Sequence, residues 1–101
     1  MQEFEILILD EANEDLEDVF AYIAYELKMP DTALTYYLGL LDKIFSLKTS
    51  AGLFAPNTRE FLTHRYGAGV YTANYKKMVI VYNIDGNTVV IRRVMPASLV
   101  L

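Results

Sequence analysis

Two helical stripes in the first half of the chain, separated by Pro30, constrain the fold more than any other feature of the sequence. Apolar residues recur at steps of three and four at Ala12, Leu16, Val19, Ile23 and Leu27. A second stripe follows at Ala33, Tyr37, Leu40, Ile44 and Leu47. This spacing predicts two amphipathic helices, one over residues 11–27 and one that opens at Pro30 and stops near Gly52. Because so short a segment connects them, the helices should form an antiparallel hairpin.

The segments on either side of the hairpin have the patterns of strands. Residues 3–9 (EFEILIL) alternate and then run apolar, as a strand buried on at least one face would. Residues 78–84 are apolar on both faces, and a turn signal at 85–87 leads into a partner strand over 88–95 that Pro96 should end. Residues 65–73 are a weaker strand interrupted by Gly67 and Gly69, and residues 50–63 resemble a loop with one short turn.

The order β-α-α-β-β-β predicts an α+β fold, in which the helical hairpin packs on a small, mainly antiparallel sheet. We expect one domain over residues 1–101, because no linker or repeat divides the chain. The 53% hydrophobic and 22% charged fractions are those of a globular protein.

Several kinds of site and location are disfavoured by the residues present. The chain has no cysteine, which excludes disulfides and thiolate nucleophiles. The first apolar run is too short for a signal peptide or a membrane span, so we expect a cytoplasmic protein without membrane contact. His64 is the one histidine, and no glycine-rich phosphate loop is present. We therefore expect no metal site and no cofactor.

Charge is distributed unevenly along the chain. Residues 1–42 hold eleven acidic residues against Lys28, a net charge of −10, whereas residues 43–101 hold eight basic and two acidic residues, a net charge of +6. Two interpretations are open: the second half builds a basic face, or the two halves attract each other within one fold. For a basic face the candidate target-binding residues are Arg65, Lys76, Lys77 and Arg93.

The tyrosines and the adjacent arginines of the second half allow predictions about the faces of the sheet. Side chains alternate along a strand, so Arg92 and Arg93 should point to opposite faces of the sheet. Tyrosines among basic residues could stack nucleobases, or they could be ordinary half-buried strand residues. The four concerned are Tyr66, Tyr71, Tyr75 and Tyr82.

Four patches of the chain together resemble the RelE/ParE toxin superfamily of bacterial toxin–antitoxin (plasmid stabilisation) systems. They are ILILDEANEDLEDVFAYIA, PDTALTYYLGLLDKIFSL, MVIVYNIDGNTVVI and RRV. The resemblance implies a small cytoplasmic toxin held inactive by a cognate antitoxin, as a homodimer or as a heterotetramer with the antitoxin. It also implies one of two activities: RelE-like members cleave mRNA on the ribosome, and ParE-like members inhibit DNA gyrase by binding it.

The chain departs from the RelE-like nucleases wherever their catalytic groups would fall. Aligned on Tyr82, the two lysines of that branch would fall near Val70 and Thr72, and its central-strand arginine near Val79. The arginine or histidine after the last strand would fall around Ala97. Valine and alanine cannot supply the general acid–base or electrostatic groups that phosphoryl transfer needs. The resemblance therefore favours the ParE-like branch, with no catalytic residue.

Three functions stay open from the sequence. The first is a ParE-like toxin that binds gyrase, although Tyr71 replaces an arginine that many ParE-like members carry. The second is a ribosome-dependent mRNA interferase, because a register shift of one or two residues would bring in other basic side chains (Lys76, Lys77 or Arg93). The third is a non-toxic remnant that only binds an antitoxin-like partner. All three require an antitoxin surface, expected on the hairpin and the adjacent sheet. The tail from Ser98 to Leu101 could pair with such a partner, pack back on the helices, or fray.

Overall fold

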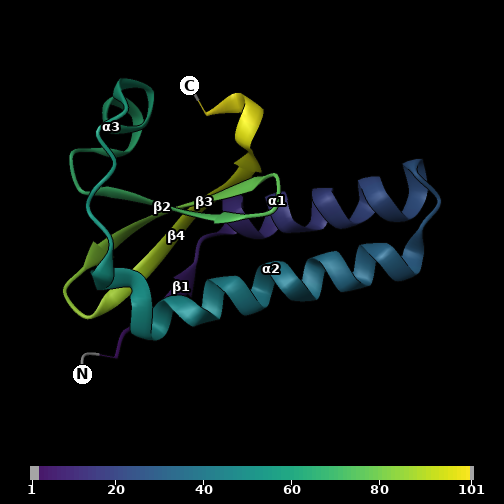
Figure 1. Cartoon of the computed structure of the whole chain (residues 1–101), viewed down its shortest axis with the longest axis horizontal. Helices are drawn as coiled ribbons and strands as arrows, with labels where there is room; N and C mark the ends of the chain where they lie inside the picture. Colours follow the sequence, from purple (N-terminus) through teal and green to yellow (C-terminus); the bar gives the residue numbers. More distant parts are fainter. Residues whose placement is uncertain (1–2, 101) are drawn as a thin grey trace.

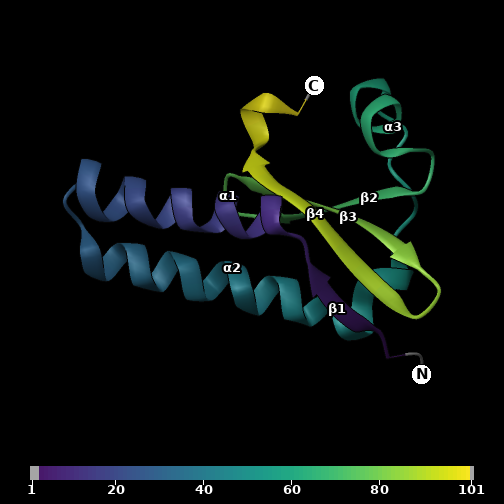
Figure 2. The same cartoon turned by 180° about the vertical axis from the view of Figure 1, so that it is seen from behind.

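The computed structural model describes residues 3–100 and confirms the α+β fold with its helical hairpin and small sheet (Figures 1 and 2). The sheet has the order β1-β4-β3-β2. The short strand β1 runs parallel to β4, and the other neighbours are antiparallel, so the sheet is mainly antiparallel as expected. The elements are β1 (Glu5–Ile8), α1 (Asp10–Ala21), η1 (Tyr22–Glu26), α2 (Pro30–Ser50), η2 (Ala51–Leu53), α3 (Glu60–Tyr66), β2 (Val70–Tyr75), β3 (Met78–Asp85), β4 (Thr88–Pro96) and η3 (Ala97–Leu99).

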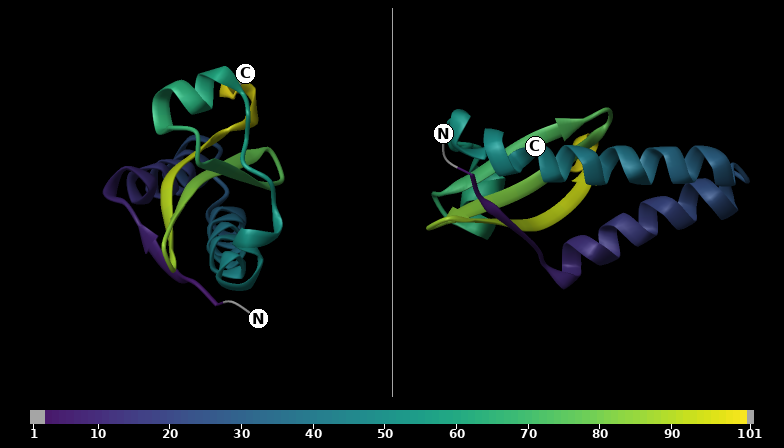
Figure 3. Two further views of the ribbon diagram at one scale, coloured as in Figure 1. Left: turned by 90° about the vertical axis from the view of Figure 1, so that its left-hand side faces the viewer. Right: turned by 90° about the horizontal axis from the view of Figure 1, so that it is seen from below.

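The sheet separates two apolar clusters of unequal size. The inner face packs against α1 and α2, where the larger cluster includes Leu16, Leu40, Ile44, Ile80 and Ile91. The outer face is covered by α3 and the C-terminal turn, which lie on the other side of the sheet from α2 (Figure 3). The outer-face cluster consists of Leu62, Val70, Val79, Val81, Met95 and Val100, with Tyr66 packed against it. Both faces of the central strands are therefore buried, as the apolar run over 78–84 predicts.

The first helix of the hairpin changes form before its expected end. It is α-helical only to Ala21 and then widens into the π-helical turn η1, in which the Leu27 amide donates to the Tyr22 carbonyl over 3.1 Å. Lys28 follows with a positive φ of 56°, and the Met29 amide caps the helix end at the Ile23 carbonyl (3.0 Å). Pro30 then opens α2, so the hairpin is confirmed and the expected single α-helix over 11–27 is corrected.

The segment before β2 ends in a helix, α3. The expected loop with one short turn is confirmed for residues 51–59, but not for 60–63, and the expected strand start at Arg65 is wrong. α3 carries Glu60 in its first turn and His64 and Arg65 in its last, which matches the helix dipole. Gly67 ends it with a φ of 93°, and the strand begins only at Val70. The buried contact of Leu62 with the outer-face cluster holds this short helix on the sheet.

A β-bulge in β4 places both arginines on the outer face, so the expectation of opposite faces is wrong. Arg93 pairs with Val81, but Ile91 pairs with Tyr82, which leaves Arg92 as the extra residue. A bulge resets the alternation of side chains along a strand. The outer face therefore carries two adjacent guanidinium groups, while Ile91 and Val94 both pack on the inner face.

Among the helices described between residues 3 and 100, none is both long and apolar enough to cross a membrane.

Candidate functional site

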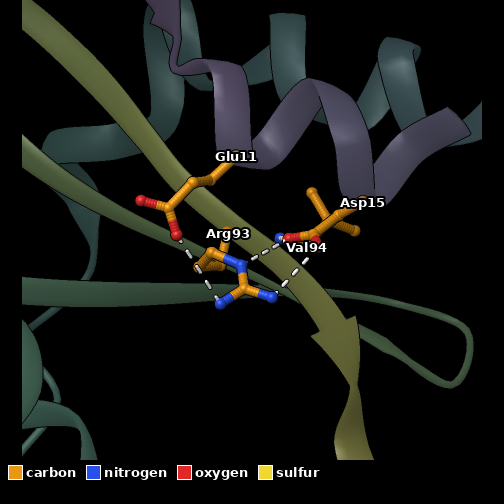
Figure 4. A network of polar contacts seen from close by, with 4 residues as sticks. All are labelled: Glu11, Asp15, Arg93 and Val94. Atoms are coloured by element: carbon orange, nitrogen blue, oxygen red, sulfur yellow. Dashed lines mark hydrogen bonds and ion pairs between the residues drawn. The ribbon is translucent and has the colours of Figure 1, made fainter. Parts of the chain in front are cut away.

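Asp15 of α1 holds the edge of β4 at the point where β1 ends. β1 pairs with β4 only as far as Ile91, and beyond that residue α1 lies beside the open edge (Figure 4). The Asp15 carboxylate accepts a hydrogen bond from the Val94 amide (2.9 Å) and two from the Arg93 guanidinium (2.7 and 3.1 Å). It thereby satisfies an edge amide that a longer β1 would otherwise have paired.

The Arg93 guanidinium is committed to this network. It lies 3.9 Å from Glu11 and makes two hydrogen bonds with Asp15, whose side chain is only 13% exposed. The hydrogen bonds to Asp15 raise the pKa of Arg93 despite the opposing effect of burial. An arginine of the basic half is thus neutralised by acids of the first helix, which is the intramolecular attraction that the charge distribution suggested.

Arg92, which the sequence did not single out as a site residue, contacts Tyr66 and Asn83 on the outer face. Its guanidinium lies 5.4 Å from the centre of the Tyr66 ring and donates to the Asn83 side chain over 3.2 Å. Asn83 in turn donates to the Gly69 carbonyl (3.0 Å). A cation over an aromatic ring and a side-chain amide form a structural cradle for this charge. No sequence signal could have revealed it, because the bulge sets the direction of the side chain.

Three of the positions where a RelE-like nuclease would carry its catalytic groups lie on the outer face of the sheet, and the fourth follows β4. Val70 and Val79 are buried there in the outer-face cluster. Thr72 accepts a hydrogen bond from the Asn57 side chain (3.1 Å). Ala97 begins the turn η3, directly after β4. These positions are used for packing and for one structural hydrogen bond.

The C-terminal tail packs on the outer face, not on the helices. Val100 is buried in the outer-face cluster, and its carbonyl accepts a hydrogen bond from Arg59 over 3.2 Å. The amide of Ala97 donates to the Lys77 carbonyl (2.8 Å), which continues the pairing of β3 and β4 into the tail. Leu101 lies outside the described residues.

The remaining candidate basic residues lie at two separate places. Lys76 and Lys77 form the β2–β3 turn, at the opposite end of the sheet from α3, which carries Arg65 (Figures 1 and 2). The Lys76 ammonium lies 5.5 Å from the ring centres of both Tyr36 and Tyr75. The structure therefore brings Lys76 and Lys77 together, but it places Arg65 apart from them and Arg93 in an ion pair.

The strand tyrosines serve packing. Tyr82 is fully buried, stacks on Tyr71 at 5.3 Å, and donates to the Ala51 carbonyl over 3.2 Å. Burial is the main cause that raises its pKa to about 12. Tyr75 approaches α2 so closely that a side chain on Gly39 would collide with its hydroxyl. These contacts favour the interpretation of ordinary strand residues over that of a base-stacking platform.

A groove of about 830 Å³ lies between the hairpin and the end of the sheet. Its apolar lining combines residues of both layers: Val19, Ile23, Leu27, Met78, Val94 and Pro96. Its polar rim consists of Asp15, Asp18, Tyr22, Tyr36 and Lys77. Beside it the hairpin exposes further apolar side chains, with Tyr25 73% and Met29 48% exposed. We call this surface the hairpin groove. An apolar floor with a polar rim is suited to an amphipathic peptide segment.

No group of three or more acidic, histidine or cysteine side chains within residues 3–100 is placed to hold a metal ion.

Comparisons with known proteins give one family match and two structures of similar fold. The family model of the ParE toxin of the type II toxin–antitoxin system, parDE, matches residues 6–99. Among solved structures, the chromosomal ParDE toxin–antitoxin system from P. aeruginosa matches with a TM-score of 0.77 at 18% identity, over 93% of this chain and 96% of that chain. The toxin–antitoxin complex RelBE2 from Mycobacterium tuberculosis matches with a TM-score of 0.63 at 22% identity, over 93% and 98%. No curated protein sequence matches. At these low sequence identities, the likeness to the two structures shows the fold alone.

Proposed function

We propose that this chain, which belongs to the ParE toxin family of type II toxin–antitoxin systems, acts by binding a protein and not by cutting RNA. The proposed target is DNA gyrase in the cytoplasm, and a cognate antitoxin keeps the toxin inactive. Stabilisation of a plasmid is a role that such a pair would serve.

The outer face of the sheet carries this proposal. A nuclease of the RelE-like branch needs basic and aromatic groups within hydrogen-bonding reach of the RNA. Here the corresponding positions include Val70 and Val79, which are buried beneath α3 and the tail. An RNA strand could reach them only after Leu62 and Val100 had left the sheet, which would expose the whole outer-face cluster to water.

The pairing of Arg93 supports the same choice. Of the candidate basic residues, Arg93 lies nearest to the end of the last strand, where a register shift could have supplied a catalytic charge. Its hydrogen bonds to Asp15 neutralise it and hold it against α1. Recruiting this guanidinium for a phosphate would leave the poorly exposed Asp15 carboxylate without its partner, at a cost of a few kcal/mol.

The hairpin groove is the proposed site for the antitoxin. Its apolar floor requires a partner with a row of apolar side chains, and Asp18 on its rim favours a partner with lysine or arginine beside that row. Residues 10–26 hold seven acidic and no basic side chains, which extends this preference along α1 and η1. We therefore expect the antitoxin to contribute a basic, amphipathic segment.

Expression with and without the cognate antitoxin tests the function. We expect growth arrest when this chain is induced alone, rescue by the co-expressed antitoxin, and relaxed plasmid DNA in the arrested cells. A ribosome-dependent cleavage assay should show no cuts in mRNA. Cuts that disappear in the Arg93→Ala variant would assign the chain to the interferases, and normal growth on induction would leave only the remnant.

A charge reversal tests the groove separately. Asp18→Lys should weaken antitoxin binding by about tenfold or more, because it places a like charge against a basic segment. Glu14→Lys is the matched control, since Glu14 is exposed on the same helix but does not line the groove. Equal effects of the two variants would show that only the overall charge matters and would remove the groove from the proposal.

A further inference from the structure

The exposed side of α2 carries a second apolar surface, distinct from the hairpin groove. Leu34, Leu38, Leu41 and Phe45 follow one another at steps of four, three and four, the spacing of a coiled-coil seam. Leu34, Leu38 and Phe45 are 51%, 54% and 48% exposed, whereas Leu41 is half-buried and also packs against the larger core cluster. The buried side of α2 uses a different set of residues: Ala33, Leu40, Ile44 and Leu47. We call the exposed set the α2 seam.

The α2 seam has a symmetric spacing. With Asp31 before it and Lys48 after it, the steps along the helix are three, four, three, four and three, centred between Gly39 and Leu40. Two such helices that run antiparallel about a twofold axis would place Leu34 beside Phe45 of the second copy, and Leu38 beside Leu41. In this arrangement each apolar side chain of one helix packs between apolar side chains of the other, as in a coiled coil, and the twofold axis makes the two halves of the contact identical.

The charges at the ends of the seam complement each other in the same arrangement. Asp31 of one copy would lie beside Lys48 of the second, and the twofold axis repeats this pair at the other end. Both side chains are exposed, and the contact of Lys48 with Glu3 at 3.7 Å is a weak surface pair. A parallel pairing would instead place Asp31 beside Asp31 and Lys48 beside Lys48.

We propose that two copies of this chain associate through the α2 seam as an antiparallel pair of helices. A cleft of about 300 Å³ lined by Glu17, Phe20, Leu34 and Tyr37 continues the apolar surface toward α1 and widens the contact. The proposal is independent of gyrase and of the antitoxin, since it uses neither the hairpin groove nor the sheet.

The length of the seam sets the strength of the dimer. Residues 31–48 span about 27 Å of helix at 1.5 Å per residue. One such helix pair buries less than the roughly 1,200 Å² typical of stable complexes. We therefore expect a reversible dimer with a dissociation constant in the micromolar range. The hairpin groove stays open in it, so one antitoxin could bind each copy.

Sedimentation velocity of the purified full-length chain over the micromolar range tests the dimer. Leu38→Glu should weaken association by at least about tenfold, because a carboxylate would be buried without a partner near the twofold axis. Leu53→Glu is the control, since Leu53 is 81% exposed and lies outside the seam. Circular dichroism should show the same helix content in all variants. A chain that stays monomeric over the whole range, or a dimer that Leu38→Glu does not change, would overturn the proposal.

A charge exchange tests the antiparallel direction. Asp31→Lys alone should weaken the dimer by several-fold, and Asp31→Lys combined with Lys48→Asp should restore it. If the double variant is no stronger than the single one, the antiparallel pairing is wrong. If Leu38→Glu abolishes antitoxin binding while the chain is monomeric throughout, the seam belongs to the antitoxin and the self-association is refuted.

Discussion

The outer face of the sheet and the helical hairpin differ in how far their apolar side chains are buried within the chain. On the outer face, Val79 and Val81 are buried by α3 and the tail, and the two arginines are held by Asp15 and Tyr66. On the hairpin, apolar side chains are half exposed or more: Tyr22, Tyr25, Leu34 and Leu38. A small monomer rarely leaves so many large apolar groups in water without a partner. The comparison shows that the two arginines of the outer face have partners within the chain, whereas the hairpin leaves large apolar side chains exposed to water.

Truncation of Leu62 is the strongest way to break this comparison. Leu62→Ala should lower the free energy of unfolding by about 2–4 kcal/mol, because it opens a cavity in the outer-face cluster. Leu53→Ala, at a residue that is 81% exposed, should change it by less than about 0.5 kcal/mol. Urea denaturation measures both. A loss at Leu62 as small as that at Leu53 would mean that the outer face is open, and a nuclease site there would regain support.

Removal of the Asp15 charge tests whether the arginine is structural. Asp15→Asn should lower the free energy of unfolding by about 1–3 kcal/mol, since Arg93 keeps its charge but loses its hydrogen-bonded counter-ion. Glu11→Gln, where the side chain is 74% exposed and the ion-pair distance is 3.9 Å, should have almost no effect. The two variants, compared by thermal unfolding, would contradict the account if they were equally stable.

A substitution in the hairpin groove should affect binding without affecting folding. Leu27→Glu should weaken antitoxin binding at least about tenfold, or about 1.4 kcal/mol, because Leu27 lines the groove and is 48% exposed in the free toxin. Its free energy of unfolding should stay within about 0.5 kcal/mol of wild type. Isothermal titration calorimetry with the antitoxin gives the first quantity and urea denaturation the second. Loss of both together would indicate that Leu27 belongs to the core and not to a binding surface.

Substitution of Tyr82 should have the smallest effect on the free energy of unfolding, and this effect should depend on pH. Tyr82→Phe should cost about 0.5–1.5 kcal/mol at neutral pH, through loss of the hydrogen bond to Ala51. Burial and Tyr71 raise the pKa of Tyr82 from 10.0 to about 12, so the neutral phenol stabilises the fold fully below pH 10. That stabilisation is lost as the pH rises from 10 to 12. Urea denaturation at several alkaline pH values should therefore show wild type losing its advantage over Tyr82→Phe. A constant difference would contradict this account of Tyr82.

The hairpin and the central strands were predictable because their signals are local. Apolar residues at helical spacing, Pro30 and the turn at 85–87 each fix structure within a few residues. The bulge at Arg92 was not predictable, since it depends on the pairing of β4 with β3. α3 was missed because it is short (Glu60–Tyr66), and because its stability comes from the contact of Leu62 with the sheet.

The candidate site was only partly within reach of the sequence. The basic residues could be named, but whether each is free depends on residues far along the chain, as with Arg93 and Asp15. The hairpin groove joins Ile23 to Val94, and no sequence pattern connects these two positions. Contacts of this kind follow from the packing of the hairpin on the sheet.

Supercoiling of plasmid DNA by purified gyrase, with the purified chain added in increasing amounts, tests the central claim most directly. The account predicts inhibition at micromolar concentrations that Leu62→Ala lessens only in proportion to unfolding and that the cognate antitoxin relieves. Undiminished supercoiling, together with ribosome-dependent cleavage of mRNA by the same preparation, would contradict it.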